Sequence, residues 1–209
     1  MKLQSFCIVP GLLGVCLGLA SRTGSLAFAA GEIDPLEGIP VISRSDWNAS
    51  PPGIGRVMHQ PRDLVIHHTE TPVASTIEGN LVRIRNIQSY HQEEKKWPDI
   101  AYHWIVTPSG RIVEGRDWRY RGDSGTRYDL DGRLLVVLLG QFGQSLPPPS
   151  QWEGLVRITA RLASRFSVPE DRIFVHSDLA QTDCPGQALK EKIESGDLLR
   201  AIRQIESSR

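Results

Sequence analysis

The sequence predicts an α/β fold, a single domain with a central sheet flanked by helices. Short apolar runs rich in β-branched residues alternate along the chain with segments whose apolar residues recur at helical spacing. About 180 residues remain once an N-terminal leader is set aside, enough for one domain with its own core and too few for two ordinary ones. We interpret residues 30–40 as a linker and residues 41–209 as the domain.

Residues 1–29 are predicted to be a signal peptide. Lys2 precedes an apolar run over 6–20, and Ala27-Phe28-Ala29 fits the small-x-small pattern of a signal peptidase site. The run is short and broken by glycine and proline, so it does not resemble a membrane-spanning helix. We therefore expect a secreted or periplasmic protein with no stable membrane insertion after cleavage. A retained N-terminal anchor is the alternative.

Four parts of the domain are predicted to contain strands. DLVIHHTET (63–71) is a compact apolar run that ends in polar residues, as a buried strand would. AYHWIVTPSGRIVEGRD (101–117) is typical of strand, turn and strand, with Pro108-Ser109-Gly110 at the turn. LLVVLLGQF (134–142) is the most apolar candidate and is expected at the centre of the sheet, and RIFVHSD (172–178) is a short strand.

The remaining periodic segments are predicted to be helices. Serine with glutamate three residues later is a capping-box pattern, and it occurs twice, at Ser75/Glu78 and Ser150/Glu153. The first is expected to begin a helix over roughly 76–94. The second precedes a helix whose apolar face carries Leu155, Ile158, Leu162 and Phe166. The C-terminal stretch 187–206 is also expected to be helical, with a break near Gly196.

The charge balance argues against nucleic-acid binding. The chain has 24 basic and 24 acidic residues. Loss of Lys2 and Arg22 with the leader leaves 22 basic against 24 acidic residues, a net charge near −2. A nucleic-acid-binding domain of this size needs a basic face, which this composition does not favour.

Cysteine usage predicts no intramolecular disulfide in the domain. Cys7 and Cys16 would be removed with the leader, which leaves Cys184 without an intramolecular partner. Secreted proteins usually pair their cysteines, so an odd one suggests a reactive thiol, an intermolecular bridge or a metal ligand.

A metal site is one explanation of this thiol. Two predicted strands end in histidines, VIHH and FVH, so His67 or His68 could meet His176 at one edge of the sheet, with Cys184 on the loop that follows. Two imidazoles and a thiolate are a recurring ligand set for catalytic zinc. A cysteine nucleophile paired with His176 is the rival, and a buried structural cysteine is a further alternative. His59 and His91 are expected to be core or otherwise satisfied histidines.

The chain resembles the zinc-dependent N-acetylmuramoyl-L-alanine amidases that share a fold with peptidoglycan recognition proteins and phage lysozyme-type amidases. The similarity runs from about residue 42 to the C-terminal helix. It rests on the blocks SRSDWNA, VIHHTETP, YHQEEKKWPDIAYHWIVTPSGRIVEGRD and HSDLAQTDCPG. The implied fold is peptidoglycan recognition protein-like.

The resemblance implies the site residues. Zinc ligands fall on His67, His176 and Cys184, and the catalytic tyrosine falls on Tyr102. Thr182 stands where recognition-protein amidases have threonine and the phage branch has lysine, so it is expected to assist catalysis.

Three further residues are expected to face substrate. His68 neighbours a ligand, and Trp97 is a candidate wall of a glycan cleft. Asp123, with Ser124, stands where relatives carry a His-Ala pair, so the lining of the cleft is expected to differ on that side. No carboxylate stands out as a general base, although Glu70 and Asp178 are candidates.

The resemblance thus implies a monomeric zinc amidase that hydrolyses the bond between N-acetylmuramic acid and L-alanine in peptidoglycan or muropeptides. Two alternatives stand beside it: a peptidoglycan-binding module without catalysis, and a cysteine hydrolase.

Overall fold

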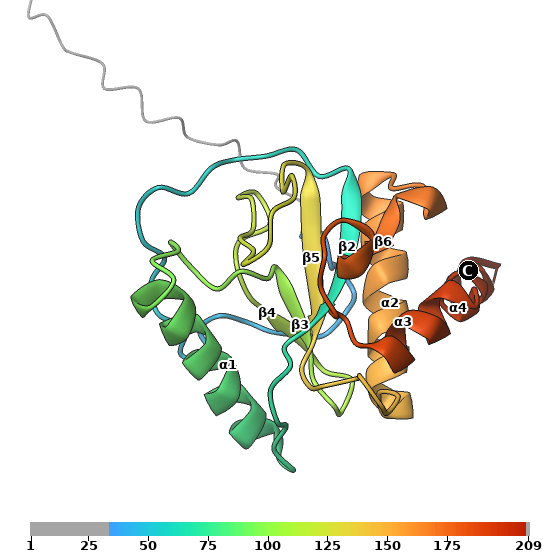
Figure 1. Cartoon of the computed structure of the whole chain (residues 1–209), viewed down its shortest axis with the longest axis horizontal. Coiled ribbons are helices and arrows are strands. Elements are labelled where there is room, and N and C mark those ends of the chain that lie inside the picture. The colour runs from blue at the N-terminus through green and yellow to red at the C-terminus, as the bar shows by residue number, and fades with distance from the viewer. Residues whose placement is uncertain (1–33, 208–209) are drawn as a thin grey trace, which may run out of the picture. The chain divides into compact units, whose positions relative to one another are not determined.

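A computed structural model describes residues 34–207, and the predicted signal peptide lies outside these residues (Figure 1). Residues from Asp34 onward form one compact unit built on a mixed sheet with helices on both faces, which confirms the predicted α/β class. Leu36, inside the segment expected to be a linker, is buried and packs in the core of this unit. No helix within residues 34–207 is long and apolar enough to cross a membrane.

The sheet has six strands in the order β1-β4-β3-β5-β2-β6. All neighbouring pairs are parallel except β3 and β4, which form the predicted antiparallel unit around the turn at 108–110. The strands are β1 (Val41–Ile42), β2 (Asp63–His68), β3 (Trp104–Val106), β4 (Ile112–Glu114), β5 (Arg133–Leu138) and β6 (Ile173–Val175). The apolar β5 lies between β3 and β2, so its predicted central position is confirmed.

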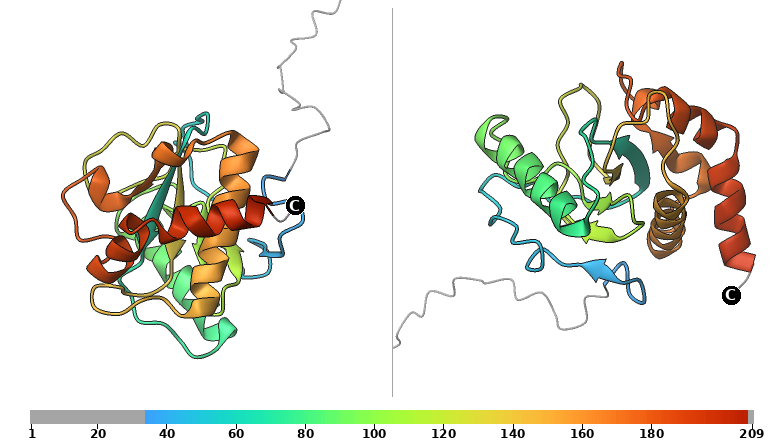
Figure 2. Two further views of the ribbon diagram at one scale, coloured as in Figure 1. Left: turned by 90° about the vertical axis from the view of Figure 1, so that its right-hand side faces the viewer. Right: turned by 90° about the horizontal axis from the view of Figure 1, so that it is seen from below.

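Helices cover the two faces of the sheet unequally. Figure 2 shows α1 against one face, with α2, α3 and α4 on the other. Their bounds are α1 (Ile77–Glu93), α2 (Pro149–Phe166), α3 (Gln187–Glu194) and α4 (Asp197–Ser207). The predicted break near Gly196 separates α3 from α4. Leu155, Ile158 and Leu162 of α2 are buried in the larger core cluster, as their spacing predicts, and Phe166 packs against it.

Both predicted capping boxes are wrong in detail. The N-cap of α1 is Thr76, not Ser75, and the Thr76 hydroxyl accepts a hydrogen bond from the Gly79 amide at 3.1 Å. Ser150 lies inside the first turn of α2, which begins one residue earlier, and its hydroxyl donates to the Pro108 carbonyl at 2.7 Å. A proline can begin a helix without a side-chain cap because it has no amide hydrogen to satisfy.

Candidate active site

Strand alternation points the two adjacent histidines of β2 to opposite faces of the sheet. Leu64 and Ile66 pack in the core cluster beneath α2, and His68 has the same parity. His67 therefore faces the α1 side, beside Val137, its register partner in β5. A side chain at the carboxyl end of an inner strand is held by neighbours on both sides, which gives His67 a fixed position.

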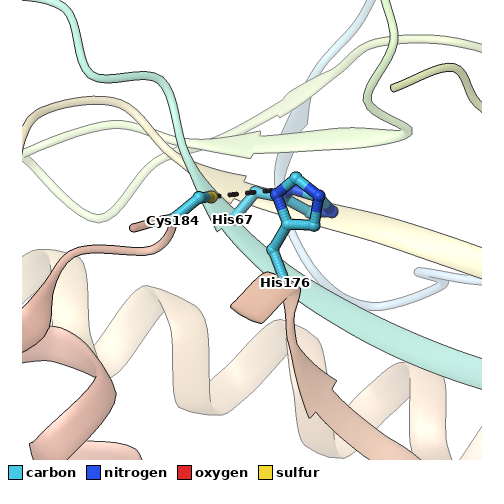
Figure 3. A group of neighbouring side chains, drawn as sticks. All are labelled: His67, His176 and Cys184. Carbon is cyan, nitrogen blue, oxygen red and sulfur yellow. Dashed lines mark hydrogen bonds between the residues drawn. The ribbon is translucent and has the colours of Figure 1, made fainter. Parts of the chain in front are cut away.

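His176 and Cys184 reach His67 from the other end of the sequence. His176 begins a short 3₁₀ turn (His176–Asp178) directly after β6, so the predicted strand over 172–178 is shorter than expected. Cys184 lies on the loop before α3, and its carbonyl accepts a hydrogen bond from the Ser177 amide at 3.0 Å. One potential ligand atom from each of His67, His176 and Cys184 lies within 4.8 Å of the others (Figure 3).

The cysteine loop is fixed by backbone contacts. The His68 amide donates to Cys184 Sγ at 3.3 Å, and the Cys184 amide donates to the Thr182 hydroxyl at 3.3 Å. Gly186 has φ +94°, and a Cβ there would lie 2.4 Å from the carbonyl carbon of Phe142. Only glycine lets the chain turn so close to this backbone, which aims the thiol at the histidines.

The nitrogens of the two imidazoles suit a metal ion. His67 Nδ1 lies 3.7 Å from Cys184 Sγ, and His176 Nδ1 is buried without a hydrogen-bond partner among residues 34–207. The Nε2 atoms are occupied differently: His176 Nε2 lies 2.7 Å from the Thr126 hydroxyl and His67 Nε2 lies 3.5 Å from that of Tyr128. A buried, unpaired nitrogen beside a second imidazole and a thiol is a set of donors that fits zinc.

Burial dominates the electrostatics of this cluster. It lowers the pKa of His67 well below its usual value, and the neighbouring His176 lowers it further. Burial also lowers the pKa of His176 to about 4 and raises the pKa of the Cys184 thiol to about 12. The imidazoles are therefore neutral at physiological pH, with lone pairs to offer. The thiol is protonated until a cation offsets its charge, which does not favour a metal-free nucleophile.

The cluster opens into a cavity of about 220 Å³ that also contains four other predicted site residues. They are His68, Trp97, Tyr102 and Asp123. The Tyr102 ring centroid lies 5.6 Å from that of His67, and burial raises the pKa of its phenol above the usual value. Its hydroxyl is thus a hydrogen-bond donor at working pH, placed beside the cluster.

Trp97 forms part of the cavity wall together with His91, which the sequence predicts to be a core histidine. The Trp97 and His91 rings lie 4.8 Å apart, and both line the cavity. His91 is buried and its Nδ1 accepts from the Ala101 amide, so it is a satisfied core histidine as expected, yet one edge belongs to the cavity.

Asp123 has a structural partner. Its carboxylate pairs at 2.5 Å with Arg116, whose side chain is only 2% exposed. The Arg116 guanidinium also donates to the carbonyls of Asp99, Ile100 and Arg121. Because a buried guanidinium needs a counter-charge, Asp123 is tied to the stability of the cavity wall, which the sequence did not indicate.

A second cavity of about 770 Å³ lies next to the first and shares two lining residues with it. Thr182, His68 and Glu70 line it, and Glu70 and His68 also line the smaller cavity. Thr182 is not among the residues that line the cavity around the cluster, although its hydroxyl bonds the Cys184 amide. Asp178 accepts a hydrogen bond from the Val175 amide and serves as a local cap.

The hydroxyls of Thr126 and Tyr128 contact the two histidines, although the sequence predicts no role for them. Both come from the loop between β4 and β5, in the stretch where the chain departs from the pattern of its relatives. No motif or periodicity marks them, because their partners lie 50 and 61 residues away in the sequence.

Comparison with known proteins agrees with this architecture. Residues 58–187 match the family model described as N-acetylmuramoyl-L-alanine amidase, and the chain belongs to this family. It is 27% identical over 162 residues to peptidoglycan recognition protein 1 of Mus musculus, covering 77% of this chain and 89% of that protein.

Two further similarities are to a human amidase and to a peptidoglycan recognition protein of known structure. It is 30% identical over 159 residues to the N-acetylmuramoyl-L-alanine amidase of Homo sapiens, covering 73% of this chain and 27% of that protein. The crystal structure of peptidoglycan recognition protein-LE in complex with tracheal cytotoxin superposes with a TM-score of 0.69 and 32% identity, covering 74% of this chain and 92% of that one. The predicted peptidoglycan recognition protein-like fold is thereby confirmed.

Proposed function

We propose that this protein is a zinc-dependent amidase that hydrolyses the amide bond between N-acetylmuramic acid and L-alanine in peptidoglycan or muropeptides. The observation that carries the proposal is the unpaired, buried His176 Nδ1, which lies with His67 and Cys184 beside the cavity that holds Tyr102. Membership of the amidase family supports the reaction class.

His67, His176 and Cys184 would hold the ion. Zinc bound there would activate water and polarise the scissile carbonyl. The neutral imidazoles need lose no proton to bind it, and the thiol gives up its proton on binding. The backbone amide of His68 donates to the sulfur and would stabilise its negative charge.

Tyr102 would act on the substrate from the side of the cavity. Because burial keeps its phenol protonated, the hydroxyl can donate a hydrogen bond to the carbonyl oxygen as negative charge develops. This role requires a donor and not a base, which agrees with the direction of the pKa shift.

The remaining assignments follow from the contacts. Trp97, half-buried against His91, would present a ring face to a sugar, since aromatic faces pack against apolar surfaces. Thr182 would hold the Cys184 loop, and Asp123 would support the wall through Arg116. His68 lies between the two cavities, where it would contact substrate that spans both.

The signal-peptide pattern of residues 1–29 supports action outside the cytoplasm, in the periplasm or after secretion. We propose that the mature protein acts as a monomer.

One experiment tests the reaction directly. The mature protein is incubated with purified muropeptides with and without a chelator, and the products are identified by mass. Release of an intact stem peptide with a free L-alanine amine, lost on chelation and restored by zinc, is the expected result. Cleavage elsewhere in the peptide, or cleavage that survives complete removal of metal, would contradict the proposal.

A second candidate function is peptidoglycan recognition without catalysis. It is favoured by relatives whose names describe recognition, such as the mouse protein. Binding of muropeptide by zinc-loaded protein with no product after prolonged incubation would support it over the amidase.

A further inference from the structure

The loop between β4 and β5 brings two hydroxyl groups against the outer nitrogens of the two histidines. Thr126 Oγ1 lies 2.7 Å from His176 Nε2, and the Tyr128 hydroxyl lies 3.5 Å from His67 Nε2. The Tyr128 ring also packs on His176, with ring centroids 5.2 Å apart. Both contacts thus involve the nitrogen that faces away from the ligand cluster.

A neutral imidazole has one N–H and one lone pair, so a partner at one nitrogen determines the chemistry of the other. If Nε2 of His176 carries the hydrogen and donates it to Thr126, the buried Nδ1 presents its lone pair to the cluster. The opposite tautomer would leave an N–H at Nδ1, where no acceptor exists among residues 34–207.

The loop gives the Thr126 hydroxyl a second hydroxyl partner, so that it can accept from His176 while its own proton is used elsewhere. Thr126 Oγ1 lies 2.9 Å from Ser124 Oγ, and the Thr126 amide donates to Ser124 Oγ at 3.2 Å. When Thr126 gives its own proton to Ser124, both lone pairs of its oxygen are free, and one can accept from His176. Asp123, three residues before Thr126 in this loop, pairs with the buried Arg116, so the loop has support that does not depend on Thr126.

We infer that Thr126 and Tyr128 are positioning residues for zinc binding: Thr126 selects the tautomer of His176, and Tyr128 holds the ring orientations of His67 and His176. The inference rests on the proposed zinc site. Hydrogen-bond partners of metal-binding histidines typically change metal affinity by about 10- to 100-fold when removed. Thr126 is expected to have the larger effect, because its contact is shorter by 0.8 Å.

The test uses the metal-free mature protein and zinc competition against a chromophoric chelator at one fixed pH. Thr126→Val keeps the shape and removes the hydroxyl, and it should weaken zinc binding by roughly 10- to 100-fold. Thr126→Ser should restore most of the affinity. Tyr128→Phe should weaken binding less than Thr126→Val. Thr159→Val is the matched control, because the Thr159 hydroxyl is buried in α2 without a hydrogen-bond partner among the described residues, so affinity should not change.

Two further readouts separate positioning from a general loss of structure. Nitrogen NMR of the metal-free protein should show the Nε2–H tautomer of His176 in the wild type and in Thr126→Ser, and a mixture in Thr126→Val. The visible spectrum of the cobalt-substituted protein should change in Thr126→Val and not in Thr159→Val. Unfolding curves establish that each variant is folded.

The outcomes distinguish the two proposals. Wild-type zinc affinity in folded Thr126→Val, with an unchanged tautomer, would overturn the positioning role and leave the zinc site intact. A wild-type protein that binds no zinc would overturn the proposed function and this inference with it.

Discussion

Two pairs of histidines in this protein are alike in burial and differ in the hydrogen-bond partners of their ring nitrogens. His67 and His176 lie at the cavity with ring centroids 4.4 Å apart, and His59 and His103 stack at 5.7 Å. Their exposed fractions overlap, at 3% and 7% in the first pair and 9% and 0% in the second. Burial alone therefore does not distinguish a ligand from a core histidine.

The nitrogen partners separate the pairs. Each ring nitrogen of His59 and His103 meets a backbone group: the carbonyls of Trp118 and Tyr120, and the amides of Gly132 and Leu135. In the cavity pair, the Nδ1 atoms have no backbone partner; one faces a thiol and the other has no hydrogen-bond partner within residues 34–207. All four ring nitrogens of the stacked pair are hydrogen-bonded to the backbone, whereas the cavity pair keeps Nδ1 atoms that can bind a ligand.

Removing a cavity-pair member should have the largest effect on function. His176→Ala or Cys184→Ser should lose most of the bound zinc and most of the activity, because alanine offers no ligand and a hydroxyl is a much poorer one than a thiolate. The fold should survive, since the core clusters are formed by the sheet and helices. Metal analysis, circular dichroism and muropeptide assays check this; full zinc content in either variant would remove that residue from the ligand set.

Tyr102→Phe should separate chemistry from metal binding. Loss of the hydroxyl should slow hydrolysis by roughly 10²- to 10⁴-fold, the usual range for a positioned acid–base group. Zinc content and muropeptide affinity should stay near those of the wild type, as the phenyl ring still packs at the cavity. Turnover at saturating substrate is the measurement, and wild-type turnover would exclude the hydroxyl from the mechanism.

Asp123→Ala should act on stability, in contrast to the cavity ligands. It deprives the buried Arg116 guanidinium of its carboxylate partner, and the expected loss is about 3 kcal/mol in the free energy of unfolding. Urea denaturation measures it, with the exposed Asp129→Ala as control. A change in muropeptide preference with no loss of stability would instead assign Asp123 to substrate binding.

The pH dependence of stability should report the satisfied core histidines. Burial lowers the pKa of His103 to about 3 and that of His91 to about 4. In the unfolded chain both titrate near 6.5, so between pH 6.5 and about 4 the unfolded state binds protons that the folded state does not. The free energy of unfolding should be highest above pH 6.5. It should fall by about 1.4 kcal/mol per pH unit for each such histidine as the pH drops.

His91→Gln tests this sign. Glutamine cannot titrate and can still accept from the Ala101 amide. Below pH 6.5 the free energy of unfolding should therefore fall less steeply with decreasing pH, by about 1.4 kcal/mol per pH unit. Urea denaturation at several pH values between 7 and 4.5 provides the comparison. An unchanged slope would mean that His91 is protonated in the folded state.

Local pattern was sufficient for most elements and insufficient at their ends. The apolar run of β5 and the helical spacing of α2 identify buried elements, because burial follows from period and composition. The cap of α1 moved from Ser75 to Thr76, since a cap depends on which residue first adopts helical backbone angles. The strand predicted over 172–178 ended at Val175 for a similar reason: the pairing of β6 with β2 covers only three residues.

The sequence by itself determined the fold class and the residue types of the candidate site: strand-end histidines, a single late cysteine and a tyrosine ahead of a strand. Tertiary structure decided which nitrogens are paired. It tied Asp123 to Arg116 and brought Thr126 and Tyr128 to imidazoles 50 and 61 positions distant. The physical reason is that period and composition are local properties of a chain, whereas the hydrogen-bond partner of a side chain can come from a segment that is distant in the sequence and adjacent only in the folded structure.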